Sequence, residues 1–580
     1  MGQTVMPKFA PRLFGHPFRR FIKREDGSLL VFGLFLFATF FLMGGMAVDV
    51  MRAENKRTAL SQALDRCALN AAALRQTLDP ETVVRDCVDR VGLLPQLTDV
   101  NVTNGTGQRS VEAIGDYELE TLFMGASGVE ELDLHARSVA EQRATNIEIA
   151  MVLDVSGSMN SNNRLSGLKT AARNFVSTVL ANNNNKISIT MVPYNGQVNL
   201  GPALAAKYNI ANQHGLGVTS NGDMATVNCV DMPSSVYEST GISTSLQMQA
   251  TGWVDAWSTM ANEYGSSMSN WPTTYSSTSR SPNGSNVWCP PSSSNIVRLP
   301  DNDVSALHTY INNLSAIGAT SINAGMKWGG ALLDPQARSV VNSFISDGEA
   351  PHQAHEVVPN VFTDRPFDYT KRDALKIILL LSDGENFGDV RLGDAYRTGL
   401  SPIYKGSDGQ YSIRHETGRP STAGTNEYWV PHRNSNAGQW RATSWGGSTS
   451  TEGVQMTWQE VWQEMRVSYV AWHFYARALG TSSSSRQTVY NTWWGNFRDQ
   501  RGTSSSTPEM DAELSDICTL TKQQGVLVYT VAFSAPTRGV TALRNCASSD
   551  GHFFHSTNNT ALNAAFQSIA TNITQLRLVN

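Results

Sequence analysis

Charged residues are scarce in this sequence, and several motifs that carry catalytic chemistry are missing. Only 16% of its 580 residues are Asp, Glu, Lys or Arg, and the net charge is −5. A chain without a basic patch or stripe is not expected to bind nucleic acid. The sequence has no C-x-x-C, no H-E-x-x-H and no G-x-S-x-G, so common signatures of zinc sites, zinc proteases and serine hydrolases are absent. We therefore expect a protein that is not an enzyme.

Charge is also absent from the whole stretch between Ser28 and Val48. As a helix, these 21 residues would be about 31 Å long, enough to cross the hydrocarbon core of a bilayer. Six basic residues precede this stretch, namely Lys8, Arg12, Arg19, Arg20, Lys23 and Arg24. Because Lys and Arg favour the cytoplasmic side, we predict a basic cytoplasmic stub at 1–27, a transmembrane helix at 28–48, and the remaining chain outside.

A cleavable signal peptide is the alternative interpretation of this stretch, with Gly45-Met46-Ala47 as the small-residue cleavage site. Helical spacing nevertheless continues beyond the apolar run. Small and apolar residues recur three and four positions apart, at Leu60, Ala63, Leu64, Cys67, Ala68 and Ala71. One long helix, half in the membrane and half outside it, is the simpler explanation of both segments.

All six cysteines follow the apolar stretch, and an even number in an exported region indicates disulfides. Six cysteines allow fifteen pairings. Pairs of neighbours in sequence are preferred, namely Cys67–Cys87, Cys229–Cys289 and Cys518–Cys546. A buried free thiol remains the alternative for any one pair.

Two regions of different pattern follow the transmembrane segment. In the region 49–140, the long helix is followed by strand-like alternation at 98–103, 110–122 and 132–140, separated by Asn-Gly and Gly-rich turns. This predicts a helix with a small α/β unit, the general plan of pilin-like proteins. The second region covers 145–580.

In the region 145–580, strands alternate with helices, which predicts βαβ units and a mostly parallel sheet. Strand-like runs occur at 147–153, 186–194, 375–381, 526–533 and 551–554, and helical patterns at 165–180, 303–314, 323–333, 513–524 and 559–576. Two insertions interrupt this plan, at 195–300 and 384–510. They hold twelve of the thirteen tryptophans, an aromatic content that argues against disorder. We expect the rings to form local cores; an aromatic binding surface for sugar or peptide is the alternative.

In the second insertion, six apolar residues are spaced as one face of a helix, namely Trp458, Val461, Trp462, Met465, Tyr469 and Trp472.

A cluster of oxygen ligands is expected where the strands end. The five residues are Asp154, Ser156, Ser158, Thr320 and Asp383. The first three form a D-x-S-x-S triplet after the strand at 147–153, and the last follows the strand at 375–381. Ligands gather at the carboxyl ends of the strands in an open parallel sheet. Carboxylate and hydroxyl oxygens are hard ligands, which suits a magnesium-like ion.

This constellation resembles the von Willebrand factor A domain and its metal-ion-dependent adhesion site. The resemblance implies a Rossmann-like α/β domain, with a mostly parallel sheet flanked by helices. It also implies a divalent cation, Mg²⁺ first, with Mn²⁺ or Ca²⁺ as alternatives. In that family the serines and the threonine bind the ion directly or through water, and the aspartates act mostly through water. An acidic side chain of a protein partner completes the shell.

Segments outside the cluster resemble TadG-type tight-adherence (Flp) pilus assembly proteins. The matching segments include Gly27-Ser28, Ala47-Val48-Asp49-Val50, Val192-Pro193-Tyr194-Asn195 and Val528-Tyr529-Thr530-Val531-Ala532-Phe533. Relatives that are processed as pilins carry Glu five residues after a Gly, whereas Gly27 is followed here by Phe32. The sequence therefore departs from the pattern for prepilin-type cleavage.

The two resemblances together imply a single-pass protein of the bacterial inner membrane, with a cytoplasmic N-terminus and a periplasmic bulk. It would assist assembly or anchoring of a Tad pilus by binding protein partners, pilus assembly components first among them. The alternative is a surface-exposed adhesin or structural subunit that binds host or matrix material.

Overall fold

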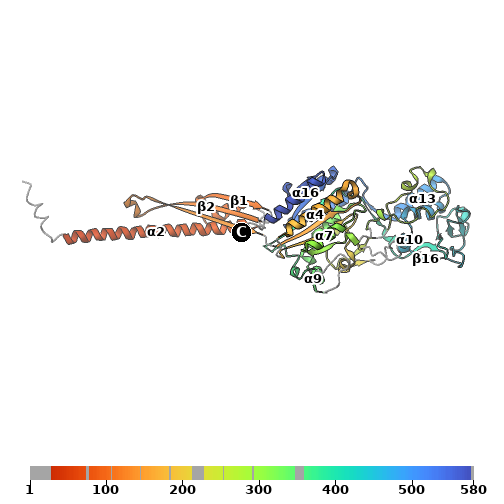
Figure 1. Cartoon of the computed structure of the whole chain (residues 1–580), viewed down its shortest axis with the longest axis horizontal. Helices are drawn as coiled ribbons and strands as arrows, with labels where there is room; N and C mark the ends of the chain where they lie inside the picture. The colour runs from red at the N-terminus through yellow and green to blue at the C-terminus, as the bar shows by residue number, and fades with distance from the viewer. Residues whose placement is uncertain are drawn as a thin grey trace, which may run out of the picture. The chain divides into compact units, whose positions relative to one another are not determined.

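The computed structural model divides the chain into two compact units, Met1–Arg143 and Ala144–Asn580 (Figure 1). The residues that it describes are 28–73, 78–105, 108–143, 146–181, 185–211, 228–251, 254–289, 293–346, 358–371 and 373–575. The predicted cytoplasmic stub at 1–27 lies outside these residues.

The first unit is built on a single 45-residue helix, α2 (Ser28–Ala72). The first half of α2 exposes apolar side chains, and by length and composition it could cross a membrane. The second half buries a stripe that includes Leu60, Leu64 and Ala68. The prediction that one helix continues through both segments is confirmed.

The buried stripe of α2 packs against a short helix and a three-stranded antiparallel sheet of order β1-β2-β3. These elements are α3 (Pro80–Arg90), β1 (Leu97–Gly105), β2 (Gln108–Glu120) and β3 (Glu131–Arg143). The Asp79 side chain accepts a 3.0 Å hydrogen bond from the Thr82 N–H and caps α3, with Pro80 in the first turn. The Cys67–Cys87 disulfide joins α3 to α2.

The second unit contains a six-stranded sheet of order β19-β18-β10-β4-β5-β9. The strands are β4 (Asn146–Asp154), β5 (Ile187–Tyr194), β9 (Arg298–Asp301), β10 (Ala374–Ser382), β18 (Leu527–Phe533) and β19 (Phe553–Ser556). Neighbours pair in parallel except β5 and β9, which are antiparallel. The central strands β4 and β10 are near-continuous apolar runs because helices cover both faces of the sheet. The antiparallel edge strand β9 is not predicted from the sequence.

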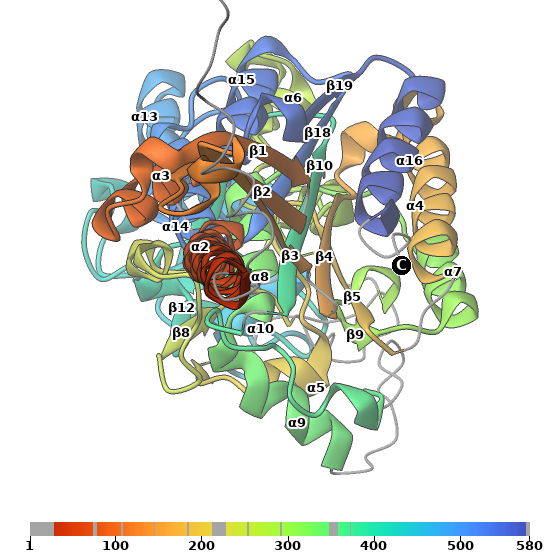
Figure 2. The same cartoon turned by 90° about the vertical axis from the view of Figure 1, so that its left-hand side faces the viewer.

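Helices cover the two faces of this sheet. Helices α4, α7 and α16 lie on one side, and α8 and α14 lie on the other (Figure 2). Their bounds, with those of α9 and α15, are α4 (Arg164–Leu180), α7 (Val304–Asn313), α8 (Ile322–Leu333), α9 (Arg338–Ser346), α14 (Pro508–Gln523), α15 (Thr537–Cys546) and α16 (Asn559–Gln575). Every residue of α8 is buried, so this helix is sandwiched between the sheet and other elements rather than exposed on one face.

The first predicted insertion, 195–300, is not a separate body. Its first part packs on the main core of the second unit, where the Tyr208 ring meets the Trp328 ring of α8 edge-on at 5.3 Å. Its last residues, from 298, belong to β9. Between them lie α5 (Gly201–Ala205), α6 (Met260–Tyr264) and a small sheet of β6 (Ile210–Ala211), β8 (Met248–Ala250) and β7 (Val230–Asp231).

The second insertion, 384–510, has its own sheets and an aromatic core. One sheet has the order β15-β14-β13-β12-β16, and the other pairs β11 with β17. The strands are β11 (Asp389–Leu392), β12 (Leu400–Lys405), β13 (Tyr411–Arg414), β14 (Tyr428–Val430), β15 (Gln439–Arg441), β16 (Val454–Thr457) and β17 (Arg498–Arg501). The core also takes in Trp271, Tyr275 and Trp288 from the first insertion. Ten of the eleven described tryptophans of the two insertions lie in or against this core. They therefore have the expected packing role, but in one shared core rather than in a local core for each insertion.

The helical face expected between Trp458 and Trp472 is divided among three short elements. They are α10 (Trp458–Glu464), α11 (Val467–Val470) and a π-helix, η13 (Ala471–Ala476), followed by α12 (Arg477–Leu479) and α13 (Ser483–Asn496). The single-helix interpretation is wrong because Met465 is extended, with φ −138° and ψ 137°. All six apolar residues of the predicted face are nevertheless buried.

Candidate functional site

The cluster begins where β4 ends. Asp154 is the last residue of that strand and is fully buried. Its Oδ1 accepts a 2.8 Å hydrogen bond from the Ser156 N–H, and its Oδ2 accepts one of 2.7 Å from the Ser382 hydroxyl. The strand thus places the carboxylate at its carboxyl end, and two neighbours fix its orientation.

The two serines connect β4 to the aspartate that follows β10. The hydroxyls of Ser156 and Ser158 lie 2.9 Å apart, and the Ser158 hydroxyl donates to Asp383 Oδ1 at 2.6 Å. Asp383 Oδ2 accepts a 2.7 Å bond from Arg164 Nη1, at the first residue of α4. The D-x-S-x-S triplet and Asp383 therefore form one hydrogen-bonded cluster.

Thr320 reaches the same edge through a loop that is hydrogen-bonded to the first one. The Gly157 N–H donates to the Gly318 carbonyl at 2.9 Å, and the Thr320 carbonyl accepts a 2.8 Å bond from the Phe387 N–H. A Cβ atom built on Gly384 would lie 3.7 Å from Thr320 Oγ1, so the loop after β10 passes close to the threonine. The structure brings all five predicted residues to one edge of the sheet.

Among the described residues, one guanidinium, that of Arg164, is paired with one of the two buried carboxylates at this edge, that of Asp383. Burial, and then the negative charge of Asp383, raise the pKa of Asp154 to about 7. Arg164, which lies 2.7 Å from Asp383, offsets part of this charge. An additional cation between the carboxylates would relieve their repulsion.

The donor set suits a hard divalent cation. Such ions take carboxylate, hydroxyl and water oxygens, and the cluster offers two carboxylates and three hydroxyls. Within the described ranges no three His, Cys, Asp or Glu side chains gather at a site that could hold a metal ion. An ion at this edge would therefore depend on the serine and threonine hydroxyls.

The sequence alone does not identify two residues that contact the cluster, Ser382 and Arg164. Ser382 stands directly before Asp383 and donates to Asp154, but a serine at the end of an apolar run carries no sign of that contact in the sequence. Arg164 lies 219 residues before Asp383, its ion-pair partner. No local pattern connects these two positions, because only the parallel pairing of β4 and β10 brings their loops together.

An aromatic pocket of about 280 Å³ opens beside the cluster. Ser158 and Thr320 contribute to its lining, and Trp257, Trp288 and Phe387 supply aromatic surface. The Trp257 and Phe387 ring centroids are 4.7 Å apart. Both insertions thus contribute residues beside the predicted ligands.

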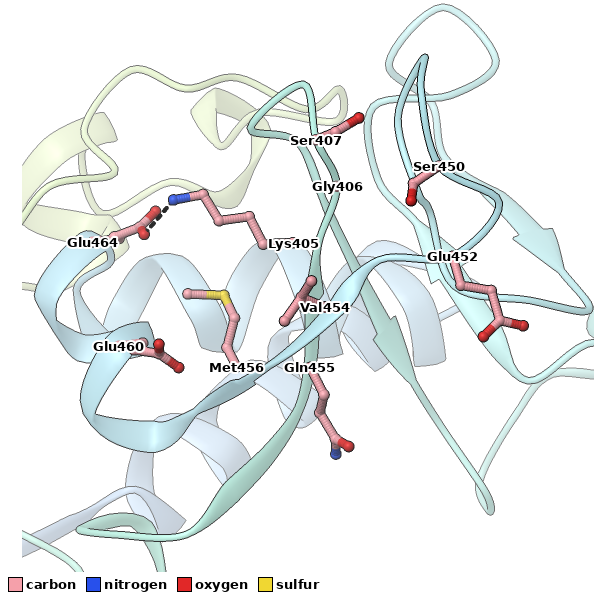
Figure 3. A pocket seen from close by; sticks show the side chains of 10 residues that line it. All are labelled: Lys405, Gly406, Ser407, Ser450, Glu452, Val454, Gln455, Met456, Glu460 and Glu464. Atoms are coloured by element: carbon pink, nitrogen blue, oxygen red, sulfur yellow. Dashed lines mark hydrogen bonds and ion pairs between the residues drawn. The ribbon is translucent and has the colours of Figure 1, made fainter.

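A second pocket, of about 310 Å³, lies within the second insertion (Figure 3). It is lined by residues of β12, β16 and α10, and it shares no residue with the cluster. Lys405 points across it toward Glu464 and pairs with that carboxylate at 2.5 Å. The positive charge of Lys405 in this pocket is therefore already paired with the carboxylate of Glu464.

Fold and cluster together define an α/β domain that gathers oxygen-bearing side chains at one edge of its sheet, in a chain with an apolar N-terminal helix. Residues 27–74 of this chain match the family model described as putative Flp pilus-assembly TadE/G-like. The N-terminal segment is therefore similar to a segment of Flp pilus-assembly proteins. No curated protein sequence matches the chain.

Solved structures with some similarity include three pilus proteins. The SpaC pilus adhesin of Lactobacillus rhamnosus GG is 9% identical with a TM-score of 0.27, and the match covers 82% of this chain and 34% of SpaC. The vWF domain of the type V pili tip protein Mfa5 from Porphyromonas gingivalis is 12% identical with a TM-score of 0.30, covering 75% of this chain and 98% of that domain. The PilB minor pilin of Streptococcus sanguinis is 12% identical with a TM-score of 0.27, and the match covers 83% of this chain and 78% of PilB. This chain thus spans about a third of SpaC, and the fold assignment rests on the strand pairings above.

Proposed function

We propose that this protein is a single-pass, non-enzymatic protein of the bacterial inner membrane that helps to assemble or anchor a Tad (Flp) pilus. In this proposal α2 is the anchor, the N-terminus is cytoplasmic and the bulk of the chain is periplasmic. The match of residues 27–74 to a pilus-assembly family supports the pilus role. The exposed apolar half of α2 supports the anchor.

The second unit, in this proposal, is a von Willebrand A domain that binds protein partners through a divalent cation, Mg²⁺ first. The observation that carries the proposal is the meeting of five oxygen-bearing side chains from three loops at one edge of the sheet. Asp154, Ser156, Ser158, Thr320 and Asp383 would hold the ion. The bound ion would supply a positive charge that attracts a carboxylate of the partner. The chain's own role is to fix the ligands: Ser382 orients Asp154, and Ser158 orients Asp383.

Metal-dependent stabilisation of the full-length protein in detergent tests this proposal. An ion that binds only the folded state stabilises it by about 2.7 kcal/mol at 100 times its dissociation constant. We expect Mg²⁺ or Mn²⁺ to raise the melting temperature after treatment with EDTA. Asp154→Asn, which keeps the side-chain shape, and Asp383→Ala should abolish the rise, and Ser156→Ala should reduce it.

Asp516→Ala is the matched control, because Asp516 is an exposed carboxylate on α14 of the same unit. This variant should keep the full response to the ion. If the native protein shows neither metal-dependent stabilisation nor metal-dependent partner binding at millimolar ion, the adhesion-site proposal is wrong. The second unit would then be a structural platform.

A further inference from the structure

The turn between β2 and β3 is uncharged and partly apolar. Residues 121–129, which we call the hairpin tip, carry no charged side chain, and Glu120 and Glu130 flank them. Leu122 is 65% exposed and Val129 is 38% exposed. The hairpin tip contains η3 (Met124–Ser127), which contacts α2 within the first unit.

The hairpin tip touches α2 inside the uncharged span rather than beyond it. The Phe123 ring meets the Phe41 ring edge-on with centroids 5.9 Å apart. A Cβ atom on Gly45 would lie 2.5 Å from the Phe123 ring, so the ring is seated against the bare backbone at that glycine. Gly45 and Phe41 precede Val48, the end of the span, by three and seven residues. Along a helix this is about 4.5 Å and 10.5 Å into the span.

The backbone of the hairpin tip is largely satisfied by internal partners. The carboxylate of Asp49 accepts the N–H groups of Leu122, Phe123 and Met124 at 2.7–3.0 Å. The N–H groups of another four residues of the tip, Thr121, Ala126, Gly128 and Val129, donate to carbonyls. Unsatisfied backbone groups are costly in hydrocarbon, so this arrangement lowers the cost of placing the tip in a bilayer.

The charged groups beyond the uncharged span indicate where the first unit becomes exposed to water. Asp49 itself is buried, and Arg52 Nη1 lies 3.3 Å from its carboxylate and 3.4 Å from the Glu120 carbonyl. Arg52 stands four residues beyond Val48. The base of the hairpin therefore lies level with the first charged turn of α2 outside the span, and the tip points back along the apolar helix.

We propose that the hairpin tip inserts into the outer leaflet of the membrane as a second contact beside α2. The inference rests on the proposed anchor: a bilayer that holds 28–48 also holds what is fixed against Phe41 and Gly45. The implied depth of Phe123, about 5–10 Å, is that of apolar side chains in interfacial segments. The partner is the lipid surface, and Leu122 and Val129 meet it directly.

Depth-dependent fluorescence quenching on the full-length protein in lipid nanodiscs tests the proposal. Because the six cysteines are all in disulfides, Leu122→Cys introduces the only free thiol for a polarity-sensitive NBD label. Two matched sites are Phe37→Cys, 68% exposed within the span, and Thr103→Cys, exposed on β1. Thr103 pairs with Ser110, ten residues along β2 from Glu120, about 33 Å away from the tip.

We expect lipids with a nitroxide near the top of the acyl chain to quench the label at 122 several-fold more than the label at 103, with aqueous iodide showing the reverse order. A label at 122 that behaves like the one at 103 overturns the inference. A label at 122 shielded from both quenchers overturns it too, because protein rather than lipid then covers the tip. If the label at 37 escapes a second nitroxide placed deep in the acyl chain, near the bilayer centre where this position is expected, the proposed anchor itself has failed.

Discussion

Arg164 is the only cation hydrogen-bonded to the cluster among the described residues, and it occupies one oxygen of Asp383. A divalent ion that used this carboxylate would compete with the guanidinium and be repelled by it. We predict that Arg164→Ala increases the affinity for Mg²⁺, measured by calorimetric titration, by about threefold to tenfold, or roughly 1 kcal/mol at an effective dielectric between water and protein.

Arg173→Ala is the control for this substitution, because Arg173 lies on the same helix, is half-buried, and bonds to Asn312 instead. It should leave the affinity for Mg²⁺ unchanged. A weaker affinity in Arg164→Ala would show that the arginine builds the site rather than competes for it.

Side chains that end strands could be located from the sequence, whereas their long-range partners could not. The positions of Asp154 and Asp383 follow from apolar runs of strand length, because such runs end at the sheet edge. The role of Asp49 depends on backbone groups 73–75 residues away. In the sequence, an acidic residue just after an apolar helix has the same appearance whether its carboxylate faces water or accepts hydrogen bonds from a distant loop.

At the scale of elements, the aromatic core of the insertions encloses two neutral histidines. His415 Nε2 lies 2.9 Å from the Phe474 carbonyl oxygen, and its ring contacts Trp440 and Tyr475. Because a carbonyl can only accept, His415 is the donor in this bond. Burial lowers the pKa of His415 from 6.5 to about 4. Burial also places the pKa of His473 well below its usual value.

We predict that acid destabilises this core between pH 6.5 and 4. In that window the unfolded chain binds protons that folded His415 rejects, so stability falls as the pH falls. The loss from His415 alone is about 3 kcal/mol. Urea unfolding followed by tryptophan fluorescence at several pH values should show it.

His415→Gln removes one titrating group and should reduce this pH dependence, leaving the part that comes from His473. His555→Gln is the control, because His555 is exposed on β19. Equal pH dependence in His415→Gln and the native protein would contradict the assignment.

The disulfides connect neighbouring elements in the pairs that sequence order predicts. Cys518 of α14 bonds to Cys546 of α15 across a separation of 28 residues, and Cys229 bonds to Cys289 across 60. In the chain-entropy account, removing the first should cost about 3.6 kcal/mol, and removing the second about 0.7 kcal/mol more. Peptide mapping of the unreduced protein should first show both links. Paired Cys→Ala variants, compared in urea unfolding, should then rank in this order.

Elements were predictable where one pattern persisted, and unpredictable where tertiary contacts overrode it. The buried strands β4 and β10 agree with the predicted runs to within one residue at each end. The six-residue apolar face after Trp458 is broken because Met465 turns extended to enter the aromatic core. Strand β9 has only four residues, Arg298–Asp301, and pairs at the sheet edge. Its strand character comes from β5 rather than from its own alternation.

At the scale of the whole molecule, the proposal fixes which side of the membrane each end occupies. We predict that a periplasm-dependent reporter fused after Asn580 is active and a cytoplasm-dependent one is silent. The physical reason is the group of basic residues before an uncharged span. Inner-membrane fractionation with a C-terminal epitope completes the test. Activity of the cytoplasmic reporter would refute the orientation, and release of the full chain to the cell surface would favour the adhesin alternative.

The position of the cluster at the end of a central strand has a mechanical consequence. β4 begins at Asn146, lies between β10 and β5, and ends at Asp154. If a partner is held at Asp154 as proposed, a pull between that partner and Asn146 acts along the axis of β4. The hydrogen bonds to both neighbours run across that axis, so they would bear the load in shear, all together, instead of opening one at a time. A strand loaded in this way resists tension better than one whose hydrogen bonds open in sequence from one end.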